Sequence, residues 1–326
     1  MRSVLLAAAL LAPASAWGGV LPKDAFSDKA AGTTGANFLK IPVGARADAL
    51  GASYVAAVDD VEAVFWNPAG LAGLESGGVS DACFSYYSLL ETAYSGSAAF
   101  AMPLGRRGGV VAGSFIYASQ GAIQGYDESG AAADSFTTRD LAASAAYAKT
   151  LGRFRVGSGL KLIRSQVADA AGTTFAVDLG GQLERAATWG DGPVDVGLSL
   201  RNLGPAIKVG TIADPLPLKL QAGGLWRISP KLSLLMDLHF PVDRDFYVSG
   251  GIEGRFPFSE GFAASLRGGY NVGHERDLDG GQDLEGLAGV SVGAGLDLRR
   301  FRMDYAWVPM GVLGSTHRIT FGVRFL

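Results

Sequence analysis

The sequence is poor in cysteine, histidine and charge. It has one cysteine, Cys83, and three histidines among 326 residues. A single cysteine excludes an intrachain disulfide. Charged residues make up 18% of the chain and hydrophobic residues 48%, which excludes intrinsic disorder because disordered chains have the opposite balance. The net charge is −3, whereas nucleic-acid-binding proteins have an excess of basic residues. We therefore expect no nucleic-acid partner.

Long hydrophobic runs are also missing. After the N-terminus, glycine, serine or a charged residue interrupts every apolar stretch well short of the ~20 residues of a membrane-spanning helix. The mean hydropathy is nevertheless +0.21. Glycine is abundant, at 47 residues, but lacks the triplet repeat of collagen. The chain is therefore a membrane protein, a large all-β protein, or both.

The N-terminus has the features of a secretory signal peptide. Arg2 supplies the positive charge, residues 4–12 the apolar region, and Ala14-Ser15-Ala16 the small-residue cleavage site. The apolar region is too short to span a membrane as a helix. We therefore expect residues 1–16 to be a signal peptide and the mature protein to be exported.

Most of the remaining chain alternates apolar and polar residues. In residues 194–203, four aliphatic residues lie on one face, and Asp195, Gly197, Ser199 and Arg201 lie on the other. This period of two is that of a β-strand. About fourteen such segments of about ten residues are present, the length with which a tilted strand crosses a bilayer. They lie near 79–89, 94–103, 107–118, 135–149, 153–166, 173–184, 194–203, 217–228, 231–240, 246–256, 262–270, 287–298, 301–308 and 316–325.

The connections between these segments differ in length on alternate sides. Those after the second, fourth, eighth, tenth and twelfth segments are short, whereas 119–134, 204–216 and 271–286 are long. Connection 185–193 is longer than this rule expects, and 241–245 is shorter. Short turns on one side and long loops on the other are typical of outer-membrane barrels.

A soluble β-sandwich would also alternate, because one face of each sheet packs in a core. A sandwich places charge on its outer face, however, and here the polar faces carry mostly glycine, serine and alanine. Aromatic residues at strand ends suit the interfacial girdles of a membrane barrel; they are Trp189, Tyr247, Tyr270, Tyr305 and Trp307. We therefore predict an all-β membrane protein, with an antiparallel transmembrane β-barrel of about 14 strands over residues 79–326.

Residues 17–78 precede the predicted barrel, and residues 35–78 do not alternate. Asn67 and Pro68 suit the start of a helix, because an asparagine side chain accepts from the first free amides and proline fits the first helical position. A solvated periplasmic linker would not carry this many aromatic side chains, which are Phe38, Tyr54, Phe65 and Trp66. We therefore expect residues 17–78 to form an N-terminal plug, or hatch, in the lumen. The candidate residues for plug contacts or ligand gating are Asp59, Asp60, Phe65, Trp66, Asn67 and Pro68.

No pattern indicates a catalytic or metal site. His239, His274 and His317 lie far apart and share no metal-ligand spacing. His317 lies on the same face of its segment as the apolar residues Ile319–Phe325, so we expect it at the membrane interface. Ser315 is too close to His317 in sequence to form a hydrolase pair with it. The acidic loop 274–285 is a weak calcium pattern, which a solvated loop explains equally well. We predict no enzyme, no metal and no cofactor.

Two parts of the sequence resemble one known family. The first comprises Phe38–Ile41, Gly44–Gly51, Tyr54–Ala56, Asp59-Asp60 and Trp66–Leu71, and the second comprises Asp304–Ala306, Leu313-Gly314 and Thr316–Ile319. They resemble the signature and the closing hairpin of the PorV/PorQ family of outer-membrane barrels. The Asn-Pro-Ala element at 67–69 is also similar to that of the FadL long-chain fatty-acid channels.

The resemblance implies a fourteen-stranded barrel with a hatch in the cell outer membrane, in contact with its lipid. It also implies one of two functions. As in the branch of the family that serves type IX secretion, the protein would be an adaptor or shuttle for exported proteins, with secreted cargo or components of the secretion machinery as partners. As in FadL, it would instead be a channel for a hydrophobic small molecule such as a long-chain fatty acid. The sequence leaves both open.

Overall fold

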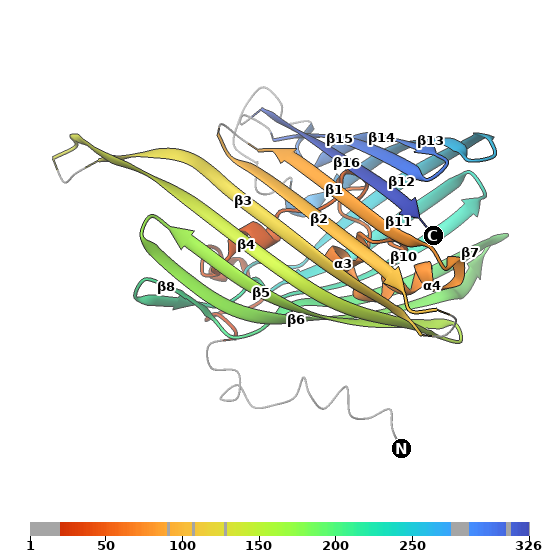
Figure 1. Cartoon of the computed structure of the whole chain (residues 1–326), viewed down its shortest axis with the longest axis horizontal. Helices are drawn as coiled ribbons and strands as arrows, with labels where there is room; N and C mark the ends of the chain where they lie inside the picture. Colours follow the sequence, from red (N-terminus) through yellow and green to blue (C-terminus); the bar gives the residue numbers. More distant parts are fainter. Residues whose placement is uncertain are drawn as a thin grey trace, which may run out of the picture.

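The barrel is closed and antiparallel, and Figure 1 shows its strands in the computed structural model. The structure describes residues 20–89, 92–105, 108–126, 129–274, 287–310 and 314–325. Fourteen strands pair in order around the barrel, and β1 closes on β16. The predicted strand number and arrangement are therefore confirmed, while the predicted signal peptide at 1–16 lies outside the described residues.

The barrel strands follow the predicted segments closely. They are β1 (Ser80–Ser88), β2 (Tyr94–Pro103), β3 (Val110–Tyr126), β4 (Ala132–Leu151), β5 (Phe154–Val167), β6 (Ala170–Trp189), β7 (Gly192–Leu203), β10 (Lys219–Ser229), β11 (Leu232–Pro241), β12 (Tyr247–Ser259), β13 (Phe262–Asn271), β14 (Val290–Leu298), β15 (Phe301–Pro309) and β16 (Ser315–Phe325). A separate hairpin of β8 (Ile207–Val209) and β9 (Ile212–Asp214) lies in the connection between β7 and β10.

The strands turn their apolar faces outward and their polar or small faces towards the lumen. In β7, Val196 and Leu198 are exposed on the outer surface, whereas Asp195 and Ser199 are buried. This division suits a wall between lipid and a filled lumen.

Two connections differ from expectation. β3 and β4 pair as far as Tyr126 and Ala132, so most of the expected loop 119–134 is a hairpin that extends beyond the neighbouring strands (Figure 1). β6 continues to Trp189, so connection 185–193, which in the sequence was longer than the rule of short turns expects, contains only a short turn and follows the rule. The β3–β4 hairpin was missed because glycine and polar residues occupy both of its faces, and no apolar face marks it.

Aromatic residues lie on the outer surface, as expected for a membrane barrel. Trp189 is exposed at the end of β6, and the Tyr305 hydroxyl lies 2.7 Å from Nδ1 of exposed His317. The expectation for Tyr247 was wrong. Its ring faces the lumen, where it stacks on buried His239 with the ring centroids 4.5 Å apart.

The helices that precede the barrel are all short. They are η3 (Asp28–Ala30), η4 (Asn37–Lys40), α2 (Ala45–Ala49), α3 (Ala63–Trp66), η5 (Pro68–Ala72) and α4 (Gly73–Gly77). Within the described part of the chain, none of them has the length and apolar character needed to cross a membrane.

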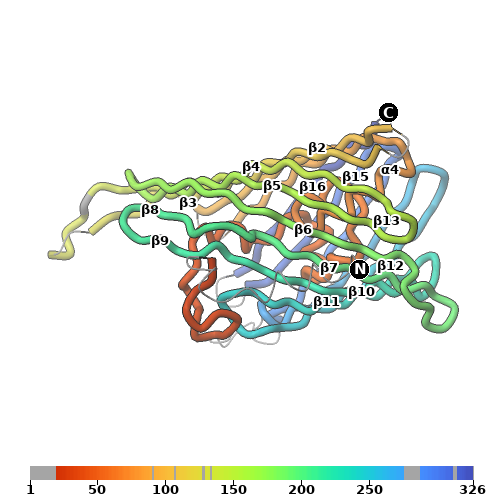
Figure 2. Tube along the Cα trace, turned by 90° about the horizontal axis from the view of Figure 1, so that it is seen from below, coloured from red at the N-terminus to blue at the C-terminus, as the bar shows by residue number. Residues whose placement is uncertain are grey.

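The chain before β1 occupies the barrel from end to end. Residues 20–42, which we call the entry segment, lie at the end of the barrel where β8 and β9 lie (Figure 2). There the amide of Phe26 donates to the carbonyl of Val242 (2.7 Å), and that of Gly35 to Pro215 (2.9 Å). We call this the loop end of the barrel.

Residues 43–78, which we call the hatch, run from the loop end through the lumen. At the opposite end, Glu75 accepts from the amides of Gly109 (3.2 Å) and Thr150 (3.0 Å), next to the short strand connections. We call this the turn end, and β1 starts there at Ser80, paired with Phe325.

Candidate functional site

The hatch packs against wall positions that have no side chain. A Cβ atom on Gly197 would lie 2.5 Å from the carbonyl oxygen of Val55, and one on Gly251 would lie 2.8 Å from that of Leu50. Real Cβ atoms essentially never approach other heavy atoms within 3.0 Å. Inward-facing glycine therefore lets the hatch backbone touch the wall, which explains part of the glycine excess.

Wall side chains replace water as partners of the irregular hatch backbone. Asp237 accepts from the amides of Tyr54 (2.7 Å) and Val55 (3.0 Å). Gln182 donates to the carbonyls of Val55 (3.1 Å) and Val58 (2.8 Å). Buried backbone outside helices and strands is stable only when such partners exist, so these contacts fix the hatch in place.

Buried ion pairs also join the hatch to the wall. The pairs are Asp60–Arg302, Arg46–Glu253 and Asp48–Arg318. Arg267 extends this network within the wall by pairing with Glu253 (2.6 Å) and with Asp304 (2.7 Å). Because removing one partner leaves an uncompensated buried charge, the network resists displacement of the hatch.

The start of α2 lies on the seam where β1 meets β16. The amide of Gly44 donates to the Tyr87 hydroxyl, and the amide of Ala45 donates to Oγ1 of Thr320 at 2.9 Å. The same Thr320 oxygen lies 2.8 Å from the Ser85 hydroxyl on β1. The hatch thus contacts both strands of the seam.

Glu62 is a buried carboxyl group beside the ion-pair network. Its Oε2 accepts from the Tyr54 hydroxyl at 3.4 Å, and its Oε1 has no hydrogen-bond partner among the described residues. Burial, followed by repulsion from Asp60, raises the pKa of Glu62 from 4.5 to about 8, although Arg302 opposes the shift. The folded hatch therefore holds Glu62 protonated at neutral pH.

This proton makes folding stability depend on pH. Between about pH 4.5 and 8, the unfolded chain has lost the Glu62 proton and the folded protein keeps it, so stability falls as pH rises. We expect Glu62→Gln to flatten this slope. Guanidinium unfolding of the detergent-solubilised protein across this range measures it, and equal slopes for variant and wild type would contradict the assignment. Asp48, whose pKa burial raises to about 6, adds its own slope at lower pH.

The structure does not bring the six predicted hatch residues together in one site. Asp60 is buried against Arg302. The neighbouring Asp59 side chain is 56% exposed, and its Oδ1 lies 3.9 Å from Nη1 of Arg46, at the limit of an ion pair. Both members of the aromatic pair, Phe65 and Trp66, are buried.

Asn67 and Pro68 start a helix as expected. Oδ1 of Asn67 accepts from the amide of Ala69 at 3.2 Å, and Pro68 begins η5. Nδ2 of Asn67 donates to the carbonyls of Val55 (2.8 Å) and wall residue Gly181 (3.2 Å). These two residues therefore fix hatch geometry.

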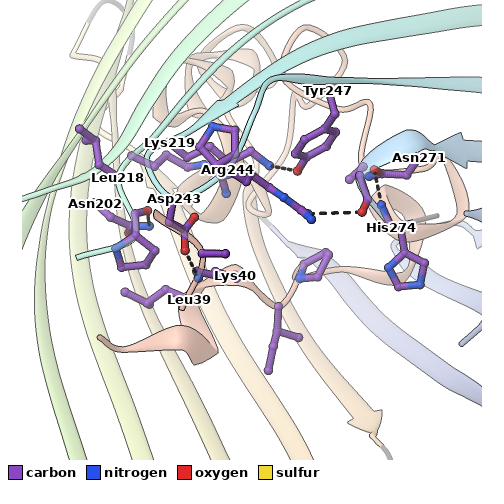
Figure 3. Close-up of a pocket in the computed structure, with 18 of the residues that line it drawn as sticks. Leu39, Lys40, Asn202, Leu218, Lys219, Asp243, Arg244, Tyr247, Asn271 and His274 are labelled. Carbon is purple, nitrogen blue, oxygen red and sulfur yellow. Dashed lines mark hydrogen bonds and ion pairs between the residues drawn. The ribbon is translucent and has the colours of Figure 1, made fainter. Parts of the chain in front are cut away.

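A cavity of about 530 Å³ lies among the hatch, the entry segment and the loop end of the barrel (Figure 3). Of the six predicted residues only Trp66 lines it. Its other apolar lining includes Leu39, Ile41 and Leu218. Its polar and charged lining includes Lys40, Arg201, Asn202, Lys219, Asp243, Arg244, Tyr247 and Asn271.

The polar groups of the cavity are held in defined positions. Nζ of Lys219 donates to the Tyr247 hydroxyl at 3.0 Å, and Lys40 pairs with Asp243 (Figure 3). The guanidinium carbon of Arg201 lies 5.0 Å from the ring centroid of Trp66, a distance typical of a cation–π contact.

The wall residues of this cavity do not stand out in the sequence. Arg201 lies on the polar face of its segment, where the sequence gives no sign of a function. Lys219 also has inward parity, as its pairing with Arg201 across β7 and β10 shows. A long cation among small inward residues was the signal available, although a solvated lumen would have explained it equally well.

The structure gives no support for a metal site in the part of the chain that it describes. There, no group of three or more His, Cys, Asp and Glu residues is placed to hold a metal ion. His239 instead lies 2.7 Å from the Ser249 hydroxyl through Nε2. Residues 275–285 of the acidic loop lie outside the described residues.

Comparison with known proteins identifies one family. The family model described as type IX secretion system protein PorV matches residues 24–226, which include the hatch and the strands from β1 to most of β10. No curated protein matches the chain.

Several solved structures share the fold. The toluene transporter TodX of Pseudomonas putida is 10% identical, with 85% of this chain and 96% of that chain covered and a TM-score of 0.53. The toluene transporter TbuX of Ralstonia pickettii is 13% identical, with 86% and 97% covered and a TM-score of 0.54. A FadL homologue of Pseudomonas aeruginosa is 9% identical, with 87% and 98% covered and a TM-score of 0.52. The chain therefore shares the barrel fold of these structures.

Proposed function

Because this chain belongs to the PorV family of type IX secretion system proteins, we propose that it is a non-enzymatic adaptor or shuttle for exported proteins in the outer membrane. The observation that carries this proposal is the family match over residues 24–226. Since the loop end of such barrels faces the cell exterior, the partners would be exported cargo or components of the secretion machinery that contact the barrel there.

The filled lumen supports this proposal over a permanently open channel. Ion pairs, backbone hydrogen bonds and close backbone packing hold the hatch against the wall. A partner protein would therefore bind to the protein's surface or mouth, and the six candidate hatch residues would act mainly by positioning the hatch.

The second candidate is a channel for a hydrophobic small molecule such as a long-chain fatty acid, with Phe65 and Trp66 gating it. The cavity favours this function, since its volume of about 530 Å³ lies within the ~300–1,000 Å³ of ligand sites, and Trp66 lines it. Movement of the hatch would have to accompany passage.

Site-specific photo-crosslinking in intact cells tests the adaptor. A photoreactive residue replaces Tyr126, which is 69% exposed at the end of β3, or Trp189, which is 67% exposed at the turn end of β6. We expect crosslinks to secreted proteins that share a C-terminal sorting domain from position 126 and none from position 189. Absence of such crosslinks at 126, together with fatty acid as the one substance that co-purifies, would favour the channel instead.

A further inference from the structure

A second hollow, a groove of about 590 Å³, lies on the outer surface of the barrel. It crosses β14, β15, β16 and β1, which are neighbours in the wall. Its lining is apolar or small apart from Arg302, whose guanidinium pairs with Asp60 of the hatch. The outward lining residues form two rows of cross-strand partners, Ala82, Val323, Phe301 and Leu298 in one row and Phe84, Phe321, Met303 and Leu296 in the other.

Two exposed arginines lie at the turn end of this groove. Leu298 ends β14 and Phe301 begins β15, so Arg299 and Arg300 form the turn between two residues that line the groove. The guanidinium carbon of Arg300 lies 5.0 Å from the ring centroid of Phe301. This contact places a cation directly beside the apolar lining.

The carboxylates around this turn have other partners. Asp297 pairs with Arg255 on β12 at 3.0 Å. The amide of Arg324 donates to the carbonyl of Arg300 (2.8 Å), and the Arg324 side chain pairs with Asp81 at 3.6 Å. Among the described residues, Arg299 and Arg300 form no ion pair with a carboxylate. Their guanidinium groups are therefore available to an anion from outside the protein.

The groove and the turn together match the two parts of a phospholipid. The groove offers an apolar surface to an acyl chain, and a guanidinium presents a planar fork of donors that fits phosphate oxygens. The turn end of outer-membrane barrels faces the periplasm, so the headgroup would belong to the periplasmic leaflet. Arginines alone would suit an acidic protein equally well, but the adjoining groove on the lipid-facing wall favours a lipid.

We propose that the groove and the Arg299-Arg300 turn bind one anionic phospholipid of the periplasmic leaflet. One acyl chain lies in the groove, and the two arginines donate to the phosphate. An anionic headgroup is preferred because it offsets the repulsion between the adjacent arginines, whereas a zwitterionic headgroup adds a cation of its own. This inference goes beyond the proposed adaptor function and does not depend on it.

The bound lipid would also stabilise the closed barrel. The groove crosses the seam, with Phe84 of β1 and Phe321 of β16 facing each other across it. A ligand that binds only the folded state raises its stability. Phosphatidylglycerol should therefore raise the temperature at which the barrel loses its folded migration on gels.

Native mass spectrometry of the purified full-length barrel in detergent tests the site. The probes are dioleoyl phosphatidylglycerol, dioleoyl phosphatidylethanolamine and glycerol 3-phosphate, which lacks acyl chains. We expect phosphatidylglycerol to bind roughly 10-fold more tightly than phosphatidylethanolamine, as two arginines near an anionic headgroup allow. Combining Arg299→Gln with Arg300→Gln should remove this preference and the thermal stabilisation. Ala82→Phe, which fills part of the groove, should weaken the binding of both lipids.

The matched control combines Arg185→Gln with Lys231→Gln, which removes two exposed cations from the turn end of β6 and from the β10–β11 turn, outside the groove lining. It should keep the preference for phosphatidylglycerol. Slower migration of boiled than unboiled protein on gels verifies that each variant is folded. Equal binding of the two lipids by the wild type, an equal loss of preference in the control, undiminished binding by Ala82→Phe, or equally tight binding of glycerol 3-phosphate would each overturn the proposal.

Discussion

Asp60→Asn is expected to lower the free energy of unfolding by about 3 kcal/mol. The substitution preserves shape and the oxygen that accepts from the amide of Glu62, but it removes the charge that pairs with Arg302. Both side chains are largely withdrawn from solvent, at 0% and 13% exposure, so the guanidinium loses a partner that water does not replace. Guanidinium unfolding followed by tryptophan fluorescence measures the change.

Asp59→Asn is the matched control for this experiment. Asp59 is the adjacent residue with the same side chain, but it is exposed and its nearest cation is 3.9 Å away. Exposed pairs contribute about 0–1 kcal/mol, so this variant should resemble the wild type. Equal losses in the two variants would show that the buried pair does not hold the hatch. Combining Asp60→Asn with Arg302→Met should recover part of the loss, since no charge then remains unpaired.

Gly269→Val is expected to displace the hatch and to cost about 3 kcal/mol, at the upper end of overpacking penalties. Any Cβ at Gly269 would overlap the backbone of Leu50 and Gly51, and backbone cannot rotate away as a side chain can. Because the hatch fills the lumen, its displacement should open a path for ions. Single-channel conductance in planar bilayers measures that path directly.

Gly268→Val is the corresponding control on the outer face of the same strand. A Cβ there meets Ile252 at 3.6 Å, an ordinary contact, and valine favours strands. We expect a closed and stable barrel. If both valine variants conduct, or if neither does, the close approach of hatch and wall is not what keeps the barrel closed.

The barrel could be predicted because its pattern repeats. In β7 and the other strands, one face contacts lipid and the other contacts the hatch, so a period of two persists for about ten residues at a time. The pattern fails where both faces meet water. The hairpin at the end of β3 and β4 has no apolar face there, and it was expected to be a loop.

The hatch could be located but not resolved into roles. Its small and aromatic residues indicated burial, and Asn67 and Pro68 indicated a helix start, which η5 confirms. Asp59 and Asp60 look alike in sequence, yet one is exposed and the other is buried against Arg302. The difference depends on a wall residue that is distant in sequence, so local patterns carry no information about it.

The cavity could not be predicted for a similar reason. Tyr247 was assigned to the membrane interface because aromatic residues at strand ends usually lie there. Its parity instead places it beside His239 in the lumen. Arg201 and Lys219 are distant in sequence, and only the register between β7 and β10 brings them together.

The contacts of α2 with the seam have a consequence for assembly order. The hatch precedes β1, and β16 is the last strand to be made, so the residue that joins them, Thr320, arrives after everything it must contact. We expect the barrel to close around a docked hatch. The amide of Ala45 and the hydroxyl of Ser85 would then be in position before Thr320 forms its hydrogen bonds with them. A chain lacking the hatch would then be slow to complete its final strand pairing, and the β1–β16 join would be the weakest line in its wall.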